Sequence, residues 1–509
     1  MFEGIFSGLW AAAPLVIQPY NILMCFVGAA FGMLVGVLPG LTATMGIALL
    51  IPLTFGMNPV AALMMLTAIH AGACTGCSIS AILISTPGTP AAAATVLDGY
   101  QMALKGRAGY AISIAVWGGF IGGIFAFLVL LFMSPPLSLI SVMFGPVEYF
   151  WLAMFGLTAV GSVSGRSPAR GLMSAAFGLF LGTVGADVIS GNERFTFGIL
   201  DLTTGIGFVP AMIGLFSLPQ VMLMSSGALF PNDAGIRVRW RDYFVGIGEL
   251  WKLRMTWVRS CIIGTIIGIL PGAGGSVSAW MAYNEERRFS KHPELFGTGV
   301  IEGVAAPECA NNAESATAYI PLITLGIPGS SAAAVLLGGL LIQGLVPGRE
   351  LFTVHAQTTY AMILGLIVAN IFVLLLGLLG SNFFAMALRV PTGVLASTIV
   401  ALCVIGSYAL ENDMFSVYVM LAFGIIGYIF KVLDFHPAPA MLGLILGPMA
   451  EKGFRHALKL SLGDPLYFFK NPISMVLIAL IFLAMVSPYL LEKWKQRTAP
   501  DLVIDEDED

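Results

Sequence analysis

A Pro-Gly pair interrupts an apolar segment that otherwise has the composition of a membrane helix. The stretch GVLPGLTATMGIALLIPLTFGM at 36–57 has no charged residue, yet Pro39 and Gly40 stand inside it. Proline removes a backbone donor and clashes with the preceding turn, so a helix is broken or kinked there. Backbone groups freed at membrane depth are tolerated only where they are buried in protein or line a water-filled cavity. The chain therefore needs a fold that surrounds this break.

Long uncharged segments place the chain in a membrane. Residues 4–97 contain no Asp, Glu, Lys or Arg, and 58% of the 509 residues are hydrophobic while 10% are charged. A helix needs about 20 apolar residues to cross a bilayer, so this block alone holds several crossings. The segments do not alternate polar and apolar residues as barrel strands do. We predict an all-α polytopic membrane protein with about 11 to 14 membrane segments, some of them partial.

The break recurs in the second half of the chain. GMLVGVLPG at 32–40 returns as GTIIGILPG at 264–272, 232 residues later. A second Pro-Gly follows each copy, in STPGTPAAAA at 85–94 and in GIPGSSAAA at 326–334, with a spacing of 241 residues. Similar segments in the same order indicate two structural repeats, each with two Pro-Gly broken or re-entrant helices.

The charges of the connecting segments indicate that the repeats are inverted. Lys and Arg gather on the cytoplasmic side of membrane proteins. Lys105 and Arg107 follow the second break of the first half, whereas Arg287, Arg288 and Lys291 lie between the two breaks of the second half. Equivalent connections therefore fall on opposite sides of the membrane.

Charge also sets the predicted boundaries: a first transmembrane half at 1–232, a cytoplasmic linker at 233–254, a second half at 255–492 and an acidic cytoplasmic tail at 493–509. The linker is rich in arginine, and the tail DLVIDEDED is expected to be a solvated end. No basic residue precedes the first apolar run, so we expect the first helix to be retained.

Broken helices in paired positions of repeats indicate a transport site near the membrane midplane. Half-helix N-termini present free N–H groups and a positive dipole end, which suit an anion. Small hydroxyl side chains follow the breaks and can replace water around a carboxylate. The predicted substrate site combines the breaks, these hydroxyls and two asparagines: Pro39, Gly40, Thr42, Thr44, Ser85, Thr86, Pro87, Gly88, Thr89, Pro271, Gly272, Gly274, Ser276, Ser278, Asn311, Asn312, Pro328, Gly329, Ser330 and Ser331.

One long polar stretch adjoins an apolar block, IEGVAAPECANNAESATAYIPL at 301–322. Polar residues at membrane depth are costly and usually functional. Glu308 and Glu314 are therefore candidates for binding a coupling ion, Na⁺ or H⁺, whereas Glu302 fits a wetted helix start equally well.

Structural roles in helix packing are expected for several other residues. Gly, Ala, Ser and Thr let membrane helices pack closely without binding anything, although close packing needs no proline. We expect His70 to be a hydrogen-bonded packing group and Leu130 to face lipid. The six cysteines are expected to be structural, because the CxxC at 74–77 lacks the further ligands of a zinc site. No metal site and no catalytic residue are predicted.

Several segments together resemble one transporter family. GVLPGLTATMGIALLIPLTFGM, ISTPGTPAAAATVLDGYQMALKGRAGYA, EGVAAPECANNA and IPLITLGIPGSSAAAVLLGGLLIQGLVPG look like the large membrane subunit of tripartite tricarboxylate transporters, the TctA family. The resemblance covers nearly the whole chain. Glu314 stands where it implies an apolar or small residue.

The resemblance implies a multi-pass secondary carrier of the bacterial inner membrane that uses no cofactor. It implies two partners, a small integral membrane subunit and a periplasmic solute-binding protein. It also implies import of a tricarboxylate such as citrate, or of a related di- or monocarboxylate, by symport with a transported cation.

Two other function classes stay open. A channel would be expected to show charge rings or filter carbonyls from several subunits rather than two halves in one chain. An intramembrane serine hydrolase needs a base within reach of its serine, and no apolar block pairs the two in a recognisable motif. No G-x-x-x-x-G-K-[ST] sequence supports ATP-driven transport, and no nucleic-acid partner is expected.

Overall fold

The computed structural model describes residues 2–140, 143–163, 168–187, 190–225, 243 and 245–498. The predicted linker residues Arg237, Arg239 and Arg241 and the acidic end beyond 498 lie outside these residues. Helices dominate the described chain, and its described sheet is one antiparallel pair, β1 (Gly185–Ala186) with β2 (Glu193–Arg194). The prediction of an all-α protein is confirmed.

Among the described residues, five helices are long and apolar enough to cross a membrane. They are α2 (Pro19–Val37), α4 (Pro59–Ile84), α6 (Ala108–Ile140), α17 (Ala356–Met386) and α19 (Met414–Val432). Shorter apolar stretches of 10–17 residues lie in α1 (Phe2–Val16), α9 (Phe208–Ser225), α15 (Ser331–Ile342), α18 (Thr392–Glu411) and α21 (Pro472–Thr498). These lengths support a multi-pass membrane protein, while the total of 11 to 14 segments stays a prediction.

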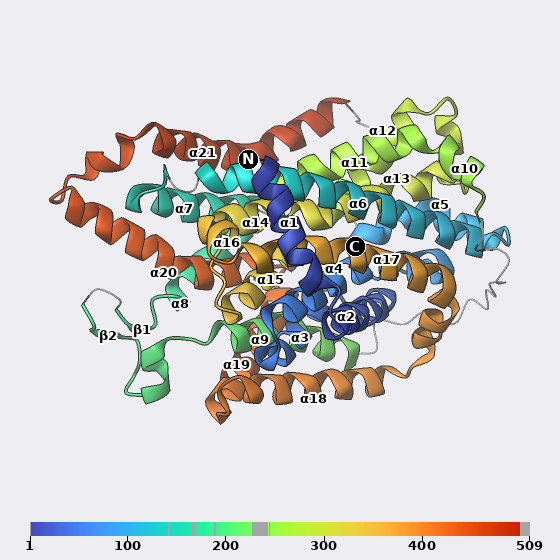
Figure 1. Cartoon of the computed structure of the whole chain (residues 1–509). Helices are drawn as coiled ribbons and strands as arrows, with labels where there is room; N and C mark the ends of the chain where they lie inside the picture. The colour runs from blue at the N-terminus through green and yellow to red at the C-terminus, as the bar shows by residue number, and fades with distance from the viewer. Residues whose placement is uncertain are drawn as a thin grey trace. The chain divides into compact units, whose positions relative to one another are not determined.

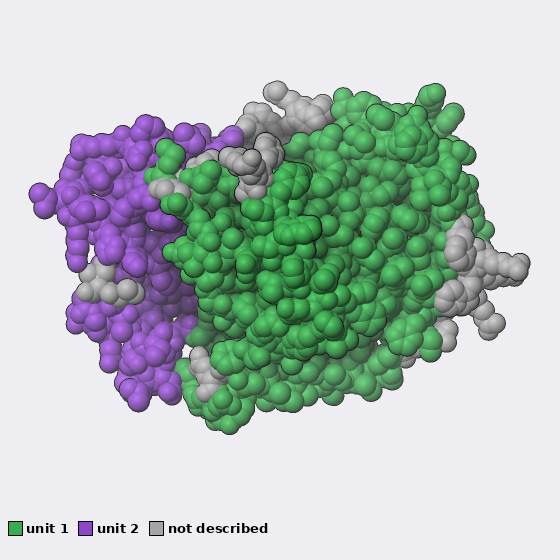
Figure 2. Space-filling model, viewed as in Figure 1, with its two compact units in different colours: residues 1–143, 207–431 green, residues 144–206, 432–509 purple. Residues whose placement is uncertain are grey.

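The chain forms two compact units (Figure 2). Unit 1 contains residues 1–143 and 207–431, and unit 2 contains residues 144–206 and 432–509. Each unit takes segments from both predicted halves, so the repeat boundaries near 232 and 255 stay a prediction of the sequence.

Unit 1 holds every predicted site residue. Its further helices are α3 (Ala43–Leu50), α5 (Ala93–Leu104), α10 (Ile247–Lys252), α11 (Arg254–Ile269), α12 (Gly274–Phe289), α13 (Glu302–Thr317), α14 (Tyr319–Leu325) and α16 (Arg349–Thr353), with short 3₁₀ helices η1 (Pro52–Gly56), η2 (Pro90–Ala92), η6 (Pro293–Leu295) and η7 (Ala387–Arg389).

Small residues bring the helices of unit 1 close together. α2 packs against α4 (Figure 1), and a Cβ added at Gly32 would lie 2.3 Å from the Ile69 carbonyl oxygen. α11 packs against α13 in the same way, and a Cβ added at Gly264 would lie 2.4 Å from the Ala310 carbonyl oxygen. The GMLVG and GTIIG segments therefore serve helix packing, as small residues do in membranes.

Leu130 does not face lipid. It is fully buried in α6, which packs against α13 and α17. The sequence prediction was wrong because an uncharged helix has no polar face to mark which side is covered by protein. Leu128, two residues earlier, is 43% exposed.

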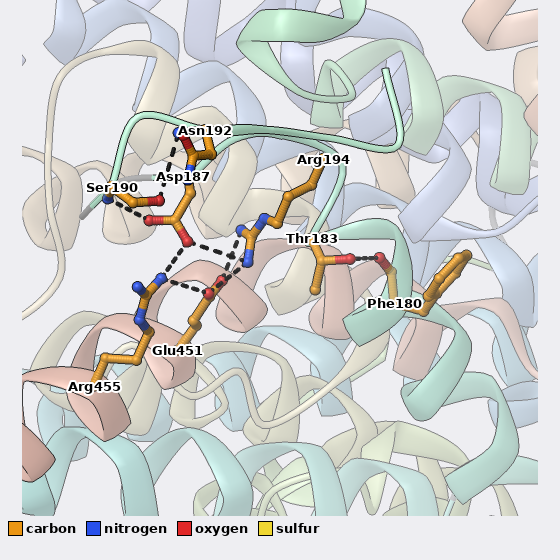
Figure 3. Close-up of polar contacts among 8 residues, drawn as sticks. All are labelled: Phe180, Thr183, Asp187, Ser190, Asn192, Arg194, Glu451 and Arg455. Carbon is orange, nitrogen blue, oxygen red and sulfur yellow. Dashed lines mark hydrogen bonds and ion pairs between the residues drawn. The ribbon is translucent and has the colours of Figure 1, made fainter. Parts of the chain in front are cut away.

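Unit 2 contains α7 (Pro146–Val163), α8 (Pro168–Leu181), the β1–β2 pair, η4 (Leu200–Thr204), α20 (Pro437–Leu460), η8 (Pro465–Phe469) and α21. An ion-pair cluster ties its β1–β2 segment to α20 (Figure 3). Arg194 donates to both carboxylate oxygens of Glu451, at 2.7 and 3.0 Å. Arg455 contacts Asp187 and Glu451. The hydrogen bond from Arg194 holds the pKa of Glu451 below its ordinary value.

Candidate functional site

The first break has the same backbone conformation in both halves. α2 and α11 are each followed by an extended leucine, Leu38 at φ −79° and ψ 116° and Leu270 at φ −79° and ψ 119°. Two residues later Gly40 and Gly272 take φ values of 83° and 87°, which residues with a Cβ rarely adopt. A new helix then begins, α3 in the first half and α12 in the second. One helix ends and another starts at both Pro-Gly positions.

The second break is also alike in the two halves. α4 is followed by Ser85 in the left-handed conformation, φ 55°, and α14 is followed by Gly326 with φ 77°. The residues before the next helices, Thr89 and Ser330, are both extended. The Ser330 hydroxyl accepts from the Ala333 N–H at 3.3 Å and so caps α15. Part of the hydrogen-bonding capacity of Ser330 is therefore used within its own half.

The two breaks of each half touch one another through glycine. A Cβ added at Gly88 would lie 2.0 Å from the Gly36 carbonyl oxygen, and one at Gly329 would lie 2.3 Å from the Gly268 carbonyl oxygen. In the second half the Gly272 N–H also donates to the Gly329 carbonyl at 2.9 Å. Both glycines thus allow close approach of backbone to backbone.

Contacts also run between the halves. η2, directly after the second break of the first half, packs against α12, which follows the first break of the second half. In the reciprocal position α15 packs against α3. These contacts connect the four breaks within unit 1.

The two predicted asparagines belong to α13, and both contact α4. Asn311 donates to the Cys74 carbonyl at 3.3 Å, and Asn312 donates to the Glu308 carbonyl at 3.0 Å. The Asn312 side-chain oxygen accepts from the Thr75 hydroxyl at 3.2 Å. Both amides are buried, so binding of a substrate here would require exchange of these bonds.

Several predicted hydroxyls have local partners. Thr42 caps α3 by accepting from the Met45 N–H at 3.3 Å. Ser278 donates to the Ala310 carbonyl at 2.8 Å, and Thr86 donates to the Ile84 carbonyl at 3.2 Å. The remaining predicted hydroxyls differ in exposure: Thr44 is buried, Thr89, Ser276 and Ser331 are half-buried, and Ser85 is exposed.

Two carboxyl groups are buried in α13. Glu308 and Glu314 are 1% and 2% exposed. Glu308 Oε1 accepts from the Thr95 hydroxyl at 2.5 Å, but within the described residues Glu308 Oε2 and Glu314 Oε1 have no hydrogen-bond partner. Burying an unpaired polar group is costly, so these groups are candidates for a function rather than for stability.

Glu314 and Asn311 face the start of α12. A Cβ added at Gly275 would lie 2.1 Å from Asn311 Oδ1 and 3.2 Å from Glu314 Oε2. The glycine therefore lets the first turn of α12 approach these two side chains. This pair of contacts joins the first break of the second half to the polar helix.

Sequence reasoning missed Asp98, which is fully buried on α5. Its carboxylate accepts from the backbone N–H groups of Gly297, Gly299 and Val300 at 2.7 to 3.0 Å and from the Tyr283 hydroxyl at 2.8 Å. It thereby holds the loop before α13 against α5. The available signal was its position as the first charged residue after the long uncharged block.

His70 is a hydrogen-bonded packing group, as predicted. Its Nδ1 lies 2.6 Å from the Tyr319 hydroxyl, and both side chains are buried. All six cysteines are buried. In the part of the chain that the structure describes, no three His, Cys, Asp or Glu side chains gather closely enough to hold a metal ion.

Comparison with known proteins places the chain among relatives. The family model described as "Tripartite tricarboxylate transporter TctA family" matches residues 22–442. The chain is 38% identical over 475 residues to the "Uncharacterized 52.8 kDa protein in TAR-I ttuC' 3'region" of Agrobacterium vitis, covering 93% of this chain and 94% of that protein. It is 36% identical over 217 residues to the "Uncharacterized protein in TAR-II ttuC' 3'region" of the same organism, covering 43% and 90%. No solved structure matches the chain.

Proposed function

This chain belongs to the tripartite tricarboxylate transporter TctA family, and from that premise we propose that it is the membrane-translocating subunit of a secondary carrier that imports a carboxylate. TctA is a family of transporters, not of enzymes. The proposal includes a small integral membrane subunit and a periplasmic solute-binding protein as partners. It also includes symport with a cation as the energy source and the bacterial inner membrane as the location.

The matched geometry of the breaks carries this proposal. We infer that the two halves are inverted repeats. The contacts that recur at the spacing of the sequence repeats support the repetition, and the different positions of the basic residues in the two halves support the inversion. Gly32 faces the Ile69 carbonyl just as Gly264 faces that of Ala310. Two repeats that each contain broken helices, with the same contacts around the breaks, are typical of carriers that bind substrate between the repeats.

The proposed site holds an anion through backbone N–H groups and hydroxyls at the breaks. α12 starts after Ala273, which provides no side-chain cap, so the first turn of this helix lacks the capping hydroxyl that Thr42 gives α3. Free N–H groups at the start of a helix bind carboxylate oxygens well, because these donors and the positive end of the helix dipole are both directed at the bound anion. Thr89 and Ser331 supply further hydroxyls beside the second breaks.

The hydrolase alternative finds no support in the geometry of His70, because its Nδ1 is occupied by the Tyr319 hydroxyl rather than by a serine. A serine nucleophile needs such a base within hydrogen-bond reach.

Uptake by proteoliposomes tests the proposal. The chain, its small membrane subunit and its binding protein are reconstituted together, and uptake of labelled citrate, malate and succinate is measured under imposed sodium or proton gradients. We expect accumulation of at least one of these acids under one gradient, and a large loss of high-affinity uptake without the binding protein. Full-rate, high-affinity uptake by the chain alone would contradict the tripartite arrangement. Absence of any uptake or exchange by the complete set would contradict the transport function for these substrates.

A further inference from the structure

The coupling ion of this carrier can be assigned from the surroundings of Glu314. We propose that Glu314 carries a transported proton, and that its ionised carboxylate occupies the anion position at the N-terminus of α12 until protonation releases it. The inference rests on the proposed function, because it names the coupling ion of the same site.

The carboxyl group of Glu314 lies beside the start of α12. α12 is 16 residues long and packs beside α13 (Figure 1). Its N-cap residue, Ala273, makes no side-chain cap, and Gly275 in the first turn lies against Glu314 Oε2. The other carboxyl oxygen, Oε1, has no hydrogen-bond partner among the described residues. A buried, incompletely bonded carboxyl group is thus directed at an uncapped helix start.

The two halves differ at this helix start. The repeat spacings of 232 and 241 residues align Gly274 with Thr42 and Glu314 with Ala73. In the first half Thr42 caps α3, and the aligned residue of the neighbouring helix α4 is Ala73, which is buried and has no polar side chain. In the second half the capping hydroxyl is absent and a carboxyl group stands on the neighbouring helix. The start of α3 is therefore capped by its own residue Thr42, whereas the start of α12 faces Glu314, whose charge depends on protonation.

The location favours a proton over a sodium ion. The N-terminus of a helix carries a partial positive charge, so it stabilises the ionised carboxylate and repels a metal cation bound at the same oxygen atoms. Protonation removes the negative charge and leaves the N–H groups available for another anion. A proton needs a single oxygen atom, whereas a metal cation needs several ligands arranged around it.

The groups around Glu314 leave it without a positively charged partner in the described residues. Cys74 of α4 and Tyr319 of α14 lie close enough to Glu314 for an electrostatic interaction, and Cys74 lies close enough to Glu308 as well. The Tyr319 hydroxyl is in turn bonded to His70. α6 and η2, which also pack against α13, contain no Asp, Glu, Lys, Arg or His.

The charged groups of the other helices packed against α13 are engaged elsewhere. Two ion pairs join Arg259 of α11 to Glu286 of α12 and Arg288 to Glu285 within α12. Asp98 of α5 accepts a hydrogen bond from Tyr283 of α12, and Arg287 of α12 donates one to the Pro293 carbonyl. Arg254 of α11 lies over the Trp251 ring. Glu314 therefore has two states, a protonated one and an ionised one held mainly by the start of α12.

Competition for one position couples the proton to the substrate. The ionised Glu314 and a substrate carboxylate repel each other and seek the same N–H groups, so the substrate binds well only after Glu314 takes up a proton. By thermodynamic linkage the bound anion then raises the proton affinity of Glu314 by the same factor. Substrate affinity should fall about tenfold per pH unit once the free carrier is ionised.

The test compares Glu314→Gln with wild type in proteoliposomes containing the three components. Glutamine has nearly the shape of a protonated glutamate but cannot release a proton. We expect the variant to lose accumulation of labelled citrate, malate or succinate driven by an acidic exterior, while counterflow exchange of the same acid without a gradient is kept. The binding constant of the variant should be independent of pH. Glu302→Gln, the same change at the half-buried start of the same helix, should accumulate substrate like wild type.

Accumulation by Glu314→Gln at the wild-type level under a proton gradient would overturn the inference. Wild-type accumulation driven by sodium alone, with no effect of a proton gradient, would overturn it as well. In both cases counterflow by wild type still supports the transport function, whereas loss of counterflow in wild type contradicts that function itself. If the variant does not fold, proton uptake by purified wild type on substrate binding in weak buffer decides the matter. About one proton per bound substrate supports the inference, and none overturns it.

Discussion

Replacing Gly329 with alanine should destabilise the contact between the two breaks of the second half. The added Cβ would lie 2.3 Å from the Gly268 carbonyl oxygen, whereas carbon and oxygen normally approach to about 3.3 Å or more. The loop must therefore retreat by about 1 Å. That movement strains the hydrogen bond from the Gly272 N–H to the Gly329 carbonyl, which is 2.9 Å long.

The magnitude follows from two costs. Overfilling a packed site costs about 1 to 3 kcal/mol, and loss of the backbone hydrogen bond adds about 0.5 to 1.5 kcal/mol. We expect Gly329→Ala to be less stable by about 1.5 to 4.5 kcal/mol, measured as the apparent unfolding temperature of purified protein at a fixed heating rate. Gly88→Ala, with its Cβ 2.0 Å from the Gly36 carbonyl, should behave similarly.

Gly56→Ala is the matched control, because a Cβ there has nothing within 4 Å and should change stability by less than about 0.5 kcal/mol. Unfolding of Gly329→Ala and Gly88→Ala within one measurement error of Gly56→Ala would refute the close approach of the breaks.

Three further predictions concern backbone strain, pH and topology. Ser85→Gly should raise the unfolding temperature, because Ser85 is left-handed at φ 55° and relief of that conformation gains about 1 kcal/mol; an unchanged or lower temperature would speak against the strain. In unit 2 the pKa of Glu451 is lowered by Arg194, so the ion pair stabilises the fold above the ordinary glutamate pKa and is lost as pH falls through the lowered one. Hydrogen exchange at β1 and β2 should therefore quicken in wild type as the pH falls below about 4.3, the ordinary glutamate pKa, and change less in Glu451→Gln, whereas equal pH dependence would exclude this role. Finally, Asn58→Cys should react with impermeant thiol reagents from the periplasm and Ser290→Cys from the cytoplasm. Labelling of both cysteines from one side would contradict the prediction that the repeats are inverted.

The sequence predicted the breaks because proline and glycine act locally. The extended leucine and the left-handed glycine at Leu38–Gly40 follow from the residues themselves, and they recur at Leu270–Gly272. The polar character of α13 could also be read from the sequence, because Glu308 and Glu314 interrupt an apolar region.

Contacts between distant segments were not predictable in this way. Asp98 is satisfied by backbone N–H groups about 200 residues further along the chain, and backbone donors leave no mark in the sequence. Gly88 and Gly329 were assigned to the substrate site from the sequence, and their close approach to the carbonyls of α2 and α11 could not be predicted from it. Leu130 was misplaced because a helix without charges is equally apolar on its buried and its lipid-facing sides.

Substrate binding by hydroxyl variants tests the central claim that a carboxylate is held at the broken helices. Thr89→Ala and Ser331→Ala are the informative changes, since Ser330→Ala also removes the cap of α15, at a cost of about 1 kcal/mol in stability. Leu128→Ala, at an exposed position of α6, is the control. Loss of one hydrogen bond to a charged substrate costs about 1.5 to 3 kcal/mol. The account therefore predicts binding of the transported acid weakened by about tenfold to a hundredfold in each site variant, with Leu128→Ala unchanged. Binding within twofold of wild type in both site variants, with normal amounts of folded protein, would contradict it.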